Sequence, residues 1–245
     1  MEIHIDRKEM KRRARASMRA HKPGPFWVTL VFALILVVLS GLSMGLQFPG
    51  ATLTDIARAY MDDAAMEKLL ALAEARGFAA RLLDTAISFM IMVLSAGYSG
   101  FCLNVSRNAP GGFGNIFDPF AIFLKVIWLN IIESFLILLW SFLLVFPGII
   151  AAYRYSMAIF ILLDDPEKGV VDCLRESKAM TQGHKGELFV LDLSFIGWLL
   201  LSVIPFVDCY TIPYMAVAKA NYYQQLSGRF AAPWLEEGAS ETDPN

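Results

Sequence analysis

Residues 26–46 read FWVTLVFALILVVLSGLSMGL and contain no charged side chain. An α-helix needs about 20 predominantly apolar residues to cross the hydrocarbon core of a bilayer, and this run has that length. A second long run, 120–146, contains only two charged residues, Lys125 and Glu133. These two segments predict an all-α fold in a protein that crosses a membrane several times.

The composition supports this prediction. The chain has 245 residues, of which 56% are hydrophobic and 18% are charged, whereas soluble domains carry about 25% charged residues. The mean hydropathy is +0.51. We therefore expect a polytopic membrane protein with about six transmembrane helices and short interfacial amphipathic helices. The expected spans are 26–46, 82–105, 120–146, 149–163, 187–204 and 210–226.

The fourth expected span is short and contains Arg154, so we expect it to be tilted, kinked or partly re-entrant. Pro147 and Gly148 precede it, and both residue types disfavour a continuous helix. The simplest interpretation is a hairpin corner at this pair, and a broken helix is the alternative.

Basic residues are concentrated before the first span. The first 22 residues include Arg7, Lys8, Lys11, Arg12, Arg13, Arg15, Arg19 and Lys22. By the positive-inside rule, this cluster places the N-terminus in the cytoplasm and the protein in the cytoplasmic membrane. Alternation of the spans then puts 47–81 outside, and 106–119, 164–186 and the C-terminus inside. Four basic residues in 47–81 conflict mildly with this orientation.

The chain divides into three parts by the same criteria. We expect a cytoplasmic basic amphipathic helix in 1–25, the transmembrane domain in 26–226, and an acidic, disordered cytoplasmic tail in 227–245. Asp6 can cap a first helix that runs to about His21. One face of that helix carries Met10, Ala14, Ser17 and Met18. This pattern suits a helix on an anionic inner leaflet, where each basic residue contributes about 1 kcal/mol; a mere orientation signal is the alternative.

Two further short helices are expected outside the spans. Asp165 and Pro166 suit a helix start, because aspartate caps and proline is tolerated in the first turn. Gly183 suits the end of the same helix, which predicts a cytoplasmic interfacial helix over 166–182. A third helix is expected at 54–76 in the external segment.

Two short motifs resemble catalytic or ligand-binding signatures. Gly97-Tyr98-Ser99-Gly100 has the GxSG form of rhomboid-type intramembrane proteases, which need a histidine base beside the serine. The histidines, His4, His21 and His184, are all expected outside the membrane, so these small residues are interpreted as a helix-packing face. In Gly183-His184-Lys185-Gly186, the simplest interpretation is a helix stop followed by a basic turn; headgroup contact by His184 and Lys185 is the alternative.

The remaining chemistry-bearing residues show no complete constellation. Cys102, Cys173 and Cys209 are far apart and odd in number, which fits neither a metal site nor a disulfide framework. We expect no catalytic residue, no cofactor and no metal.

Charged residues inside the spans are the strongest candidates for function, because such residues are costly in hydrocarbon. Asp192 and Lys219 are expected at depths that differ by about 3 Å, which predicts an ion pair between the fifth and sixth spans. Glu133 lies near the middle of the third span, roughly 12 Å in depth from Arg154. Structural pairing and a substrate or proton path both remain open for these four residues.

Several long motifs resemble a known family. They are LLVFPGIIAAYRYSMAIFILLDDP (143–166), ESKAMTQGHKGELF (176–189), LDLSFIGW (191–198), IPY (212–214) and the basic opening KRRARASMRAH (11–21). They resemble the bacterial integral membrane family called domain of unknown function 975, most strongly over 118–226. Asp165 departs from the asparagine that the family more often has before the proline. The resemblance implies a multi-spanning inner-membrane protein without an established activity, and it supplies no catalytic residue.

Together these features favour a non-enzymatic membrane protein that binds lipid or partner proteins at the cytoplasmic face. The expected partners are the bilayer, its anionic phospholipid headgroups and a further membrane protein, with no nucleic acid. The candidate headgroup contacts are Arg12, Arg13, Lys178, His184 and Lys185. The alternative is a small transporter or permease component that uses Glu133, Arg154, Asp192 and Lys219, and a lipid-modifying enzyme is a third interpretation.

Overall fold

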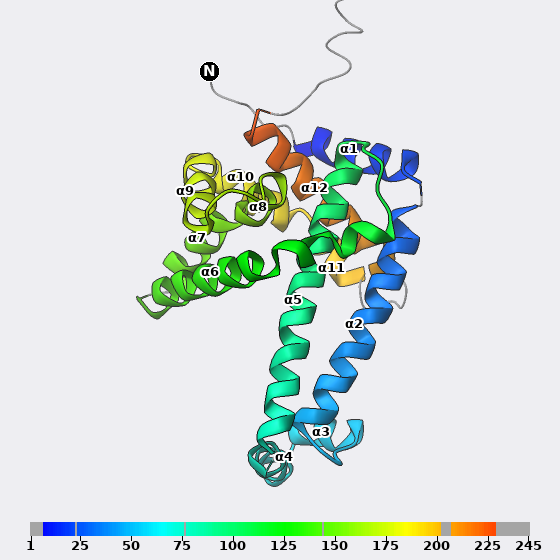
Figure 1. Cartoon of the computed structure of the whole chain (residues 1–245), viewed down its shortest axis with the longest axis vertical. Coiled ribbons are helices and arrows are strands. Elements are labelled where there is room, and N and C mark those ends of the chain that lie inside the picture. Colours follow the sequence, from blue (N-terminus) through cyan, green and yellow to red (C-terminus); the bar gives the residue numbers. More distant parts are fainter. Residues whose placement is uncertain (1–6, 23, 76, 144, 202–206, 229–245) are drawn as a thin grey trace, which may run out of the picture.

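The computed structural model describes residues 7–22, 24–75, 77–143, 145–201 and 207–228, and all regular secondary structure within these ranges is helical (Figure 1). The elements are α1 (Arg7–Ala20), α2 (Pro25–Gln47), α3 (Leu53–Ala59), α4 (Asp63–Ala75), α5 (Phe78–Ser106), η1 (Phe113–Ile116), η2 (Asp118–Ile122), α6 (Phe123–Leu143), α7 (Val145–Tyr155), α8 (Ala158–Asp164), α9 (Val170–Met180), α10 (Lys185–Leu193), α11 (Ile196–Leu201) and α12 (Asp208–Leu226). The predicted all-α fold is therefore confirmed.

Within the described residues, four stretches are long and apolar enough to cross a membrane: Pro25–Gln47, Phe78–Ser106, Phe113–Phe142 and Pro147–Asp164. They coincide with the first four predicted spans. The predicted total of six is not confirmed, because the fifth expected span is divided into α10 and α11 and the sixth, α12, carries many polar residues.

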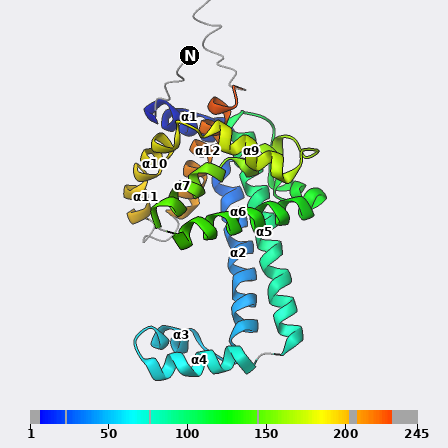
Figure 2. The same ribbon diagram turned by 90° about the vertical axis from the view of Figure 1, so that its left-hand side faces the viewer.

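Helices α2 and α5 form a long antiparallel hairpin that projects from the rest of the molecule (Figures 1 and 2). Near the base of the hairpin the hydroxyl oxygens of Thr29 and Tyr98 lie 2.8 Å apart, and Phe32 stacks on Tyr98 with 4.4 Å between ring centroids. Further along, many apolar side chains of α2 are exposed, among them Leu34 and Val37. A projecting apolar hairpin of this kind has the surface that suits lipid.

The far tip of the hairpin consists of α3 and α4 (Figure 1). A capping box starts α3: the Thr52 hydroxyl accepts a hydrogen bond from the Asp55 amide, and the Asp55 carboxylate accepts one from the Thr52 amide at 2.9 Å. A turn at residues 60–62 separates the two helices. The predicted helical segment 54–76 is thus divided in two.

Helix α6 lies across the α2–α5 hairpin in both views, and α7 folds back along α6 (Figures 1 and 2). Gly148 permits their close approach, because a Cβ at this position would lie 2.9 Å from the Ser141 Cβ and 3.0 Å from its Cα. Helix α6 ends at Leu143 and α7 begins at Val145, and Pro147 lies in the first turn of α7, where proline is tolerated. The two helices therefore pack as the predicted hairpin, and Pro147 lies inside α7.

A break at Ser156 and Met157 divides the fourth expected span into α7 and α8. Side chains of α9 replace the missing helical hydrogen bonds there. The Ser177 hydroxyl donates to the Arg154 carbonyl at 2.9 Å and accepts from the Met157 amide at 3.2 Å, and Thr181 also donates to the Arg154 carbonyl. The break is thus stabilised by tertiary contacts, and it agrees with the expectation of a kinked fourth span.

The start of α9 differs from the prediction. Gly169 is the residue before the helix, while Asp165 and Pro166 belong to a preceding turn in which the Lys168 amide donates to the Asp165 carbonyl. The Lys168 ammonium then contacts Glu176 at 2.6 Å, which ties this turn to the helix. The end agrees better, since Gly183 follows α9 with a φ of +88°, a conformation that favours glycine.

Helix α1 packs on the end of the molecule opposite α3 and α4, in contact with α12 and α5. Its buried side chains are Met10, Ala14, Ser17 and Met18, so the predicted shared face is confirmed. That face is covered by protein, however, which corrects the expectation of a helix that rests its apolar side on a leaflet. The predicted cap, Asp6, lies outside the described residues. The core of the molecule surrounds α12, where Tyr214, Tyr222 and Tyr223 are buried.

Candidate functional site

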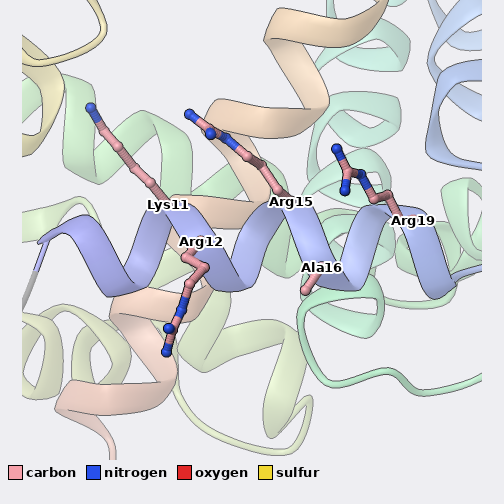
Figure 3. Close-up of a pocket in the computed structure, with 5 residues that line it drawn as sticks. All are labelled: Lys11, Arg12, Arg15, Ala16 and Arg19. Atoms are coloured by element: carbon pink, nitrogen blue, oxygen red, sulfur yellow. The ribbon is translucent and has the colours of Figure 1, made fainter.

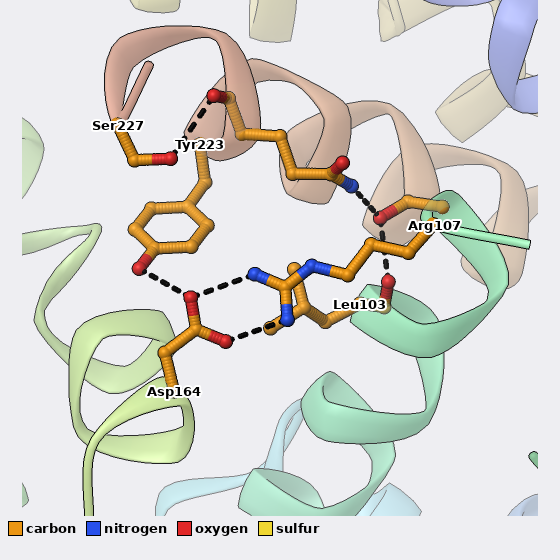
Figure 4. Close-up of polar contacts among 7 residues, drawn as sticks. Leu103, Arg107, Asp164, Tyr223 and Ser227 are labelled. Atoms are coloured by element: carbon orange, nitrogen blue, oxygen red, sulfur yellow. Dashed lines mark hydrogen bonds and ion pairs between the residues drawn. The ribbon is translucent and has the colours of Figure 1, made fainter. Parts of the chain in front are cut away.

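The polar contacts at the α1 end of the molecule hold three helices together (Figure 4). Arg107, at the end of α5, forms two hydrogen bonds of 2.7 Å with the Asp164 carboxylate at the end of α8. The Tyr223 hydroxyl of α12 donates to the same carboxylate at 2.8 Å. A bidentate arginine pair with a third donor is a strong and directional arrangement. It holds α5, α8 and α12 together and pairs the positive charge of Arg107 with the Asp164 carboxylate.

A row of cations runs along the exposed side of α1. Lys11, Arg15 and Arg19, spaced four residues apart, point the same way from the helix, and Arg12 points to the other side (Figure 3). These four side chains and Ala16 line a cavity of about 520 Å³. We call the four cations the α1 basic row. Because one helical turn separates Lys11, Arg15 and Arg19 from one another in succession, these three members present a stripe of positive charge.

Aromatic contacts hold two members of the α1 basic row in place. The Lys11 ammonium lies 4.6 Å from the centroid of the Phe195 ring and donates to the Ser194 carbonyl at 3.2 Å. The Arg15 guanidinium lies 5.4 Å from the centroid of Tyr214. Such cation–π contacts orient a cation on the protein surface. Lys11 and Arg15 are therefore held in defined positions on the protein surface.

A second group of cations lies where α7, α9 and α10 meet. The pKa of Lys185 is lowered by burial and by the positive charges of Arg154 and Lys178. The Arg154 guanidinium lies 5.7 Å from the centroid of the Trp140 ring. Because like charges that lower a lysine pKa repel one another, an anion bound among these three cations would relieve the repulsion.

The GHKG turn has a clear structural role. His184 Nδ1 lies 3.1 Å from the Glu187 carboxylate, and the Tyr222 hydroxyl lies between two acceptors, the His184 carbonyl at 3.2 Å and Glu187 at 3.1 Å. These contacts join the start of α10 to α12. Of the predicted headgroup contacts, Lys178 and Lys185 thus belong to the second cation group, while His184 is directed to Glu187. Arg12 and Arg13 lie on α1.

The GxSG segment is a packing site. A Cβ on Gly97 would come within 2.8 Å of the Ile116 Cα, so only glycine lets η1 approach α5 this closely. The Ser99 hydroxyl donates to the Ser95 carbonyl of its own helix at 3.1 Å. His21 contacts the Gly111 carbonyl and the Phe101 ring. Both described histidines are thus engaged away from Ser99, and His4 lies outside the described residues.

A polar cavity of about 550 Å³ lies between α5, α6, α7, α8 and α12. Its lining comprises Met92, Ser95, Ala96, Ser99, Asn130, Glu133, Ala152, Ser156, Ile159 and Lys219. We call it the Glu133 cavity. The Glu133 carboxyl and the Lys219 ammonium are close enough to interact electrostatically. Two opposite charges on a cavity among apolar helices are unusual, and such residues mark a functional site by default.

The structure brings together different pairs from those expected. Lys219 faces Glu133, whereas Asp192 lies beside the Tyr153 hydroxyl of α7. Arg154 lies over Trp140 and near Lys185, and Glu133 is in the cavity. The depth argument assumed that all spans run side by side, and α6 instead lies across the hairpin.

Two features were missed from the sequence. One is the α1 basic row as a fixed stripe, although the spacing of Lys11, Arg15 and Arg19 carried that signal. The other is Asp84 of α5, which is buried and accepts hydrogen bonds from Ser43 at 2.5 Å and from Gln47 at 3.2 Å. A lone acid near the start of the second span, opposite polar residues at the end of the first, was the available signal.

These observations define a protein whose described residues form a helical fold with four apolar stretches of membrane length, a basic end and a polar cavity between its helices. Residues 142–230 match the family described as Protein of unknown function (DUF975), which confirms over this segment the resemblance seen in the sequence. No curated protein and no solved structure matches the chain. The matched segment includes Lys178, Lys185 and Lys219, whereas the α1 basic row and Glu133 precede it.

Proposed function

We propose that this is a non-enzymatic membrane protein whose basic end binds anionic phospholipid headgroups at the cytoplasmic face. The observation that carries this proposal is the α1 basic row, four cations around one cavity on the surface of the molecule. Guanidinium and ammonium groups are the side chains that bind phosphate, arginine by paired hydrogen bonds and lysine as a point charge.

The position of α1 supports headgroup binding over simple membrane anchoring. The apolar face of α1 packs on α12 and α5, so α1 does not need lipid to cover it. Its cations therefore project from a helix that the protein itself holds in place. Each cation near an anionic leaflet contributes about 1 kcal/mol, and several held in a row act together.

The second cation group lies at the same end of the molecule as the α1 basic row. In both views α1, α9 and the last turns of α12 lie opposite the α3–α4 tip (Figures 1 and 2). Lys178 and Lys185 thus add positive charge at the end that carries the α1 basic row. Under the positive-inside rule this end faces the cytoplasm, where the anionic leaflet lies.

The test compares two sets of charge removals in the full-length protein. We expect Arg12, Arg19 and Lys178 changed together to glutamine to lower the phosphatidylglycerol retained after detergent purification at least tenfold. Lipid extraction and native mass spectrometry measure the bound lipid. The matched control changes Arg58, Lys68 and Arg81 at the other end, which removes the same charge and should leave retention unchanged. Equal loss in both sets, or loss in neither, would refute the proposal, and a basic end that serves a membrane protein partner would then be the remaining interpretation.

A second candidate function, transport of a small solute or amphiphile, is favoured by the Glu133 cavity. A polar cavity within apolar helices is where carriers hold their substrates. Flux into proteoliposomes, compared between the wild-type protein and Glu133→Gln, tests this candidate. Absence of wild-type flux for ions, zwitterions and amphiphiles would exclude transport without affecting the headgroup proposal.

A further inference from the structure

The Glu133 cavity has a lining that is rich in hydrogen-bond acceptors. The hydroxyls of Ser95, Ser99 and Ser156 donate to carbonyls of their own chain segment at 2.8, 3.1 and 3.0 Å. Asn130 likewise uses its NH₂ group on the Val126 carbonyl at 2.9 Å. Since each hydroxyl has a single proton, the three oxygens keep only acceptor capacity, as does the Asn130 amide oxygen.

The two charged groups complete this pattern. Glu133 adds a carboxyl with two oxygens from α6, and Lys219 adds the ammonium from α12. The described contacts of these two side chains include no ion pair within 4.0 Å between them. An acidic and a basic side chain that line one cavity without forming an ion pair leave room for a ligand between them.

A ligand that is complementary to this lining carries one positive and one negative group. Several acceptors around a carboxyl fit a primary ammonium, whose three N–H groups need three acceptors. A single ammonium, that of Lys219, fits a phosphate or carboxylate. The volume of about 550 Å³ falls in the ordinary range of small-molecule sites.

The surroundings of the cavity indicate where the ligand comes from. Ser95 is exposed, so the cavity opens at the surface of the helix bundle. Two apolar side chains of the lining, Met92 and Ile159, are themselves half-exposed. A mouth beside such residues lies against hydrocarbon when α6 is in a membrane, and acyl chains can then remain in the bilayer while a headgroup enters.

We propose that the Glu133 cavity binds a zwitterion with a primary ammonium and a phosphate, as in the headgroup of phosphatidylethanolamine. Glu133, with Asn130 and the serine oxygens, receives the ammonium, and Lys219 receives the phosphate. This site is separate from the basic end, which has no acidic group among the four cations of the α1 basic row. It supplies a ligand class for the transport candidate, but binding is expected whether or not the ligand is moved.

The test measures lipid binding to the purified full-length protein in detergent by native mass spectrometry. We expect the wild-type protein to bind phosphatidylethanolamine at least tenfold more tightly than phosphatidylcholine, because a quaternary ammonium has no N–H to donate. Glu133→Gln should abolish most of this preference. Lys219→Gln should weaken both lipids by a similar factor and leave the preference in place, because both lipids carry the phosphate.

Controls separate this site from unfolding and from the basic end. Glu74→Gln and Lys68→Gln change the same residue types on exposed α4 and should leave binding unchanged. If Glu133→Gln does not elute as a folded protein, Asn130→Leu carries the test, with an expected severalfold loss of the preference. Removal of the α1 basic row should not alter the preference, so failure of one proposal leaves the other standing.

Two results would overturn the inference: equal binding of both lipids to the wild-type protein, or an unchanged preference in Glu133→Gln and Asn130→Leu. Soluble O-phosphoethanolamine distinguishes the source of the ligand. Displacement of the lipid by this compound at equal concentration would support the site with a soluble ligand. A lack of displacement, together with the lipid preference, would support the site with a membrane lipid.

Discussion

Gly97 occupies the position where an added methyl group has the least room. The atoms that a Cβ would meet belong to the backbone of Ile116, which cannot rotate away, and its Cα would be 2.8 Å distant. Overpacking of this kind costs about 1–3 kcal/mol. We expect Gly97→Ala to lower the free energy of unfolding by that amount, measured as a fall in the thermal midpoint in detergent. The control is Gly100→Ala one turn later, where the new Cβ would meet only the Leu163 side chain at 3.7 Å; equal losses would contradict this explanation.

The pKa of Lys185 depends on the charges of the second cation group. Its pKa is lowered in the folded protein by burial and by Arg154 and Lys178. The unfolded chain therefore binds this proton more tightly, and stability should rise with pH between the lowered pKa and the ordinary value of 10.5. We expect Lys185→Gln to remove that rise and to weaken the stabilisation by phosphatidylglycerol, both measured as thermal midpoints. An unchanged pH dependence would show that Lys185 is not under this repulsion.

Helix α1 depends on its docked face. Ala14 has no exposed surface, whereas Ala16 on the same helix is exposed. A carboxylate buried without a partner costs several kcal/mol, so Ala14→Asp should release α1 from α12 and α5. Amide hydrogen exchange of residues 10–20 should then increase strongly, while Ala16→Asp should leave it close to wild type. If both variants exchange alike, the apolar face of α1 is not held by the protein.

The elements that could be predicted from sequence are those whose own residues determine them. The run 26–46 is uncharged over a full span, and it forms one continuous helix. The break between α7 and α8 could not be foreseen, because Ser177 of α9 supplies the hydrogen bonds that replace the helical ones. The start of α9 could not be predicted for a similar reason: the Lys168 contact with Glu176 holds Asp165 and Pro166 in a turn.

For the candidate sites, too, single residues could be predicted from the sequence, but their tertiary contacts could not. Glu133, Arg154, Asp192 and Lys219 could be selected from the sequence as charges in apolar surroundings. Their partners could not, because depth along a common normal predicts contacts only when the helices run side by side. Helix α6 lies across the α2–α5 hairpin, which brings Glu133 to Lys219 and leaves Asp192 beside Tyr153.

The crossing of α6 also leads to a prediction for the whole molecule in its membrane. The α2–α5 hairpin carries α3 and α4 away from the basic end, whereas the end of α6 and the start of α7 lie far from that tip in both views (Figures 1 and 2). Alternation of the expected spans puts the turn that follows α6 outside, at the level of 47–81. With α6 across the hairpin, we expect the turn to remain within the bilayer. Phe142, 93% exposed at the end of α6, is the residue to probe.

Single cysteines introduced after replacement of Cys102, Cys173 and Cys209 measure this arrangement in intact cells. A membrane-impermeant maleimide should label Ala64→Cys on α4 directly and Gln182→Cys after α9 only once the cells are opened. Phe142→Cys should resist the reagent from both sides and, when spin-labelled, should be accessible to oxygen rather than to a water-soluble relaxant. Labelling of Phe142→Cys from outside would mean that α6 crosses the bilayer completely. Labelling of Gln182→Cys in intact cells would reverse the orientation and remove the basic end from the anionic leaflet.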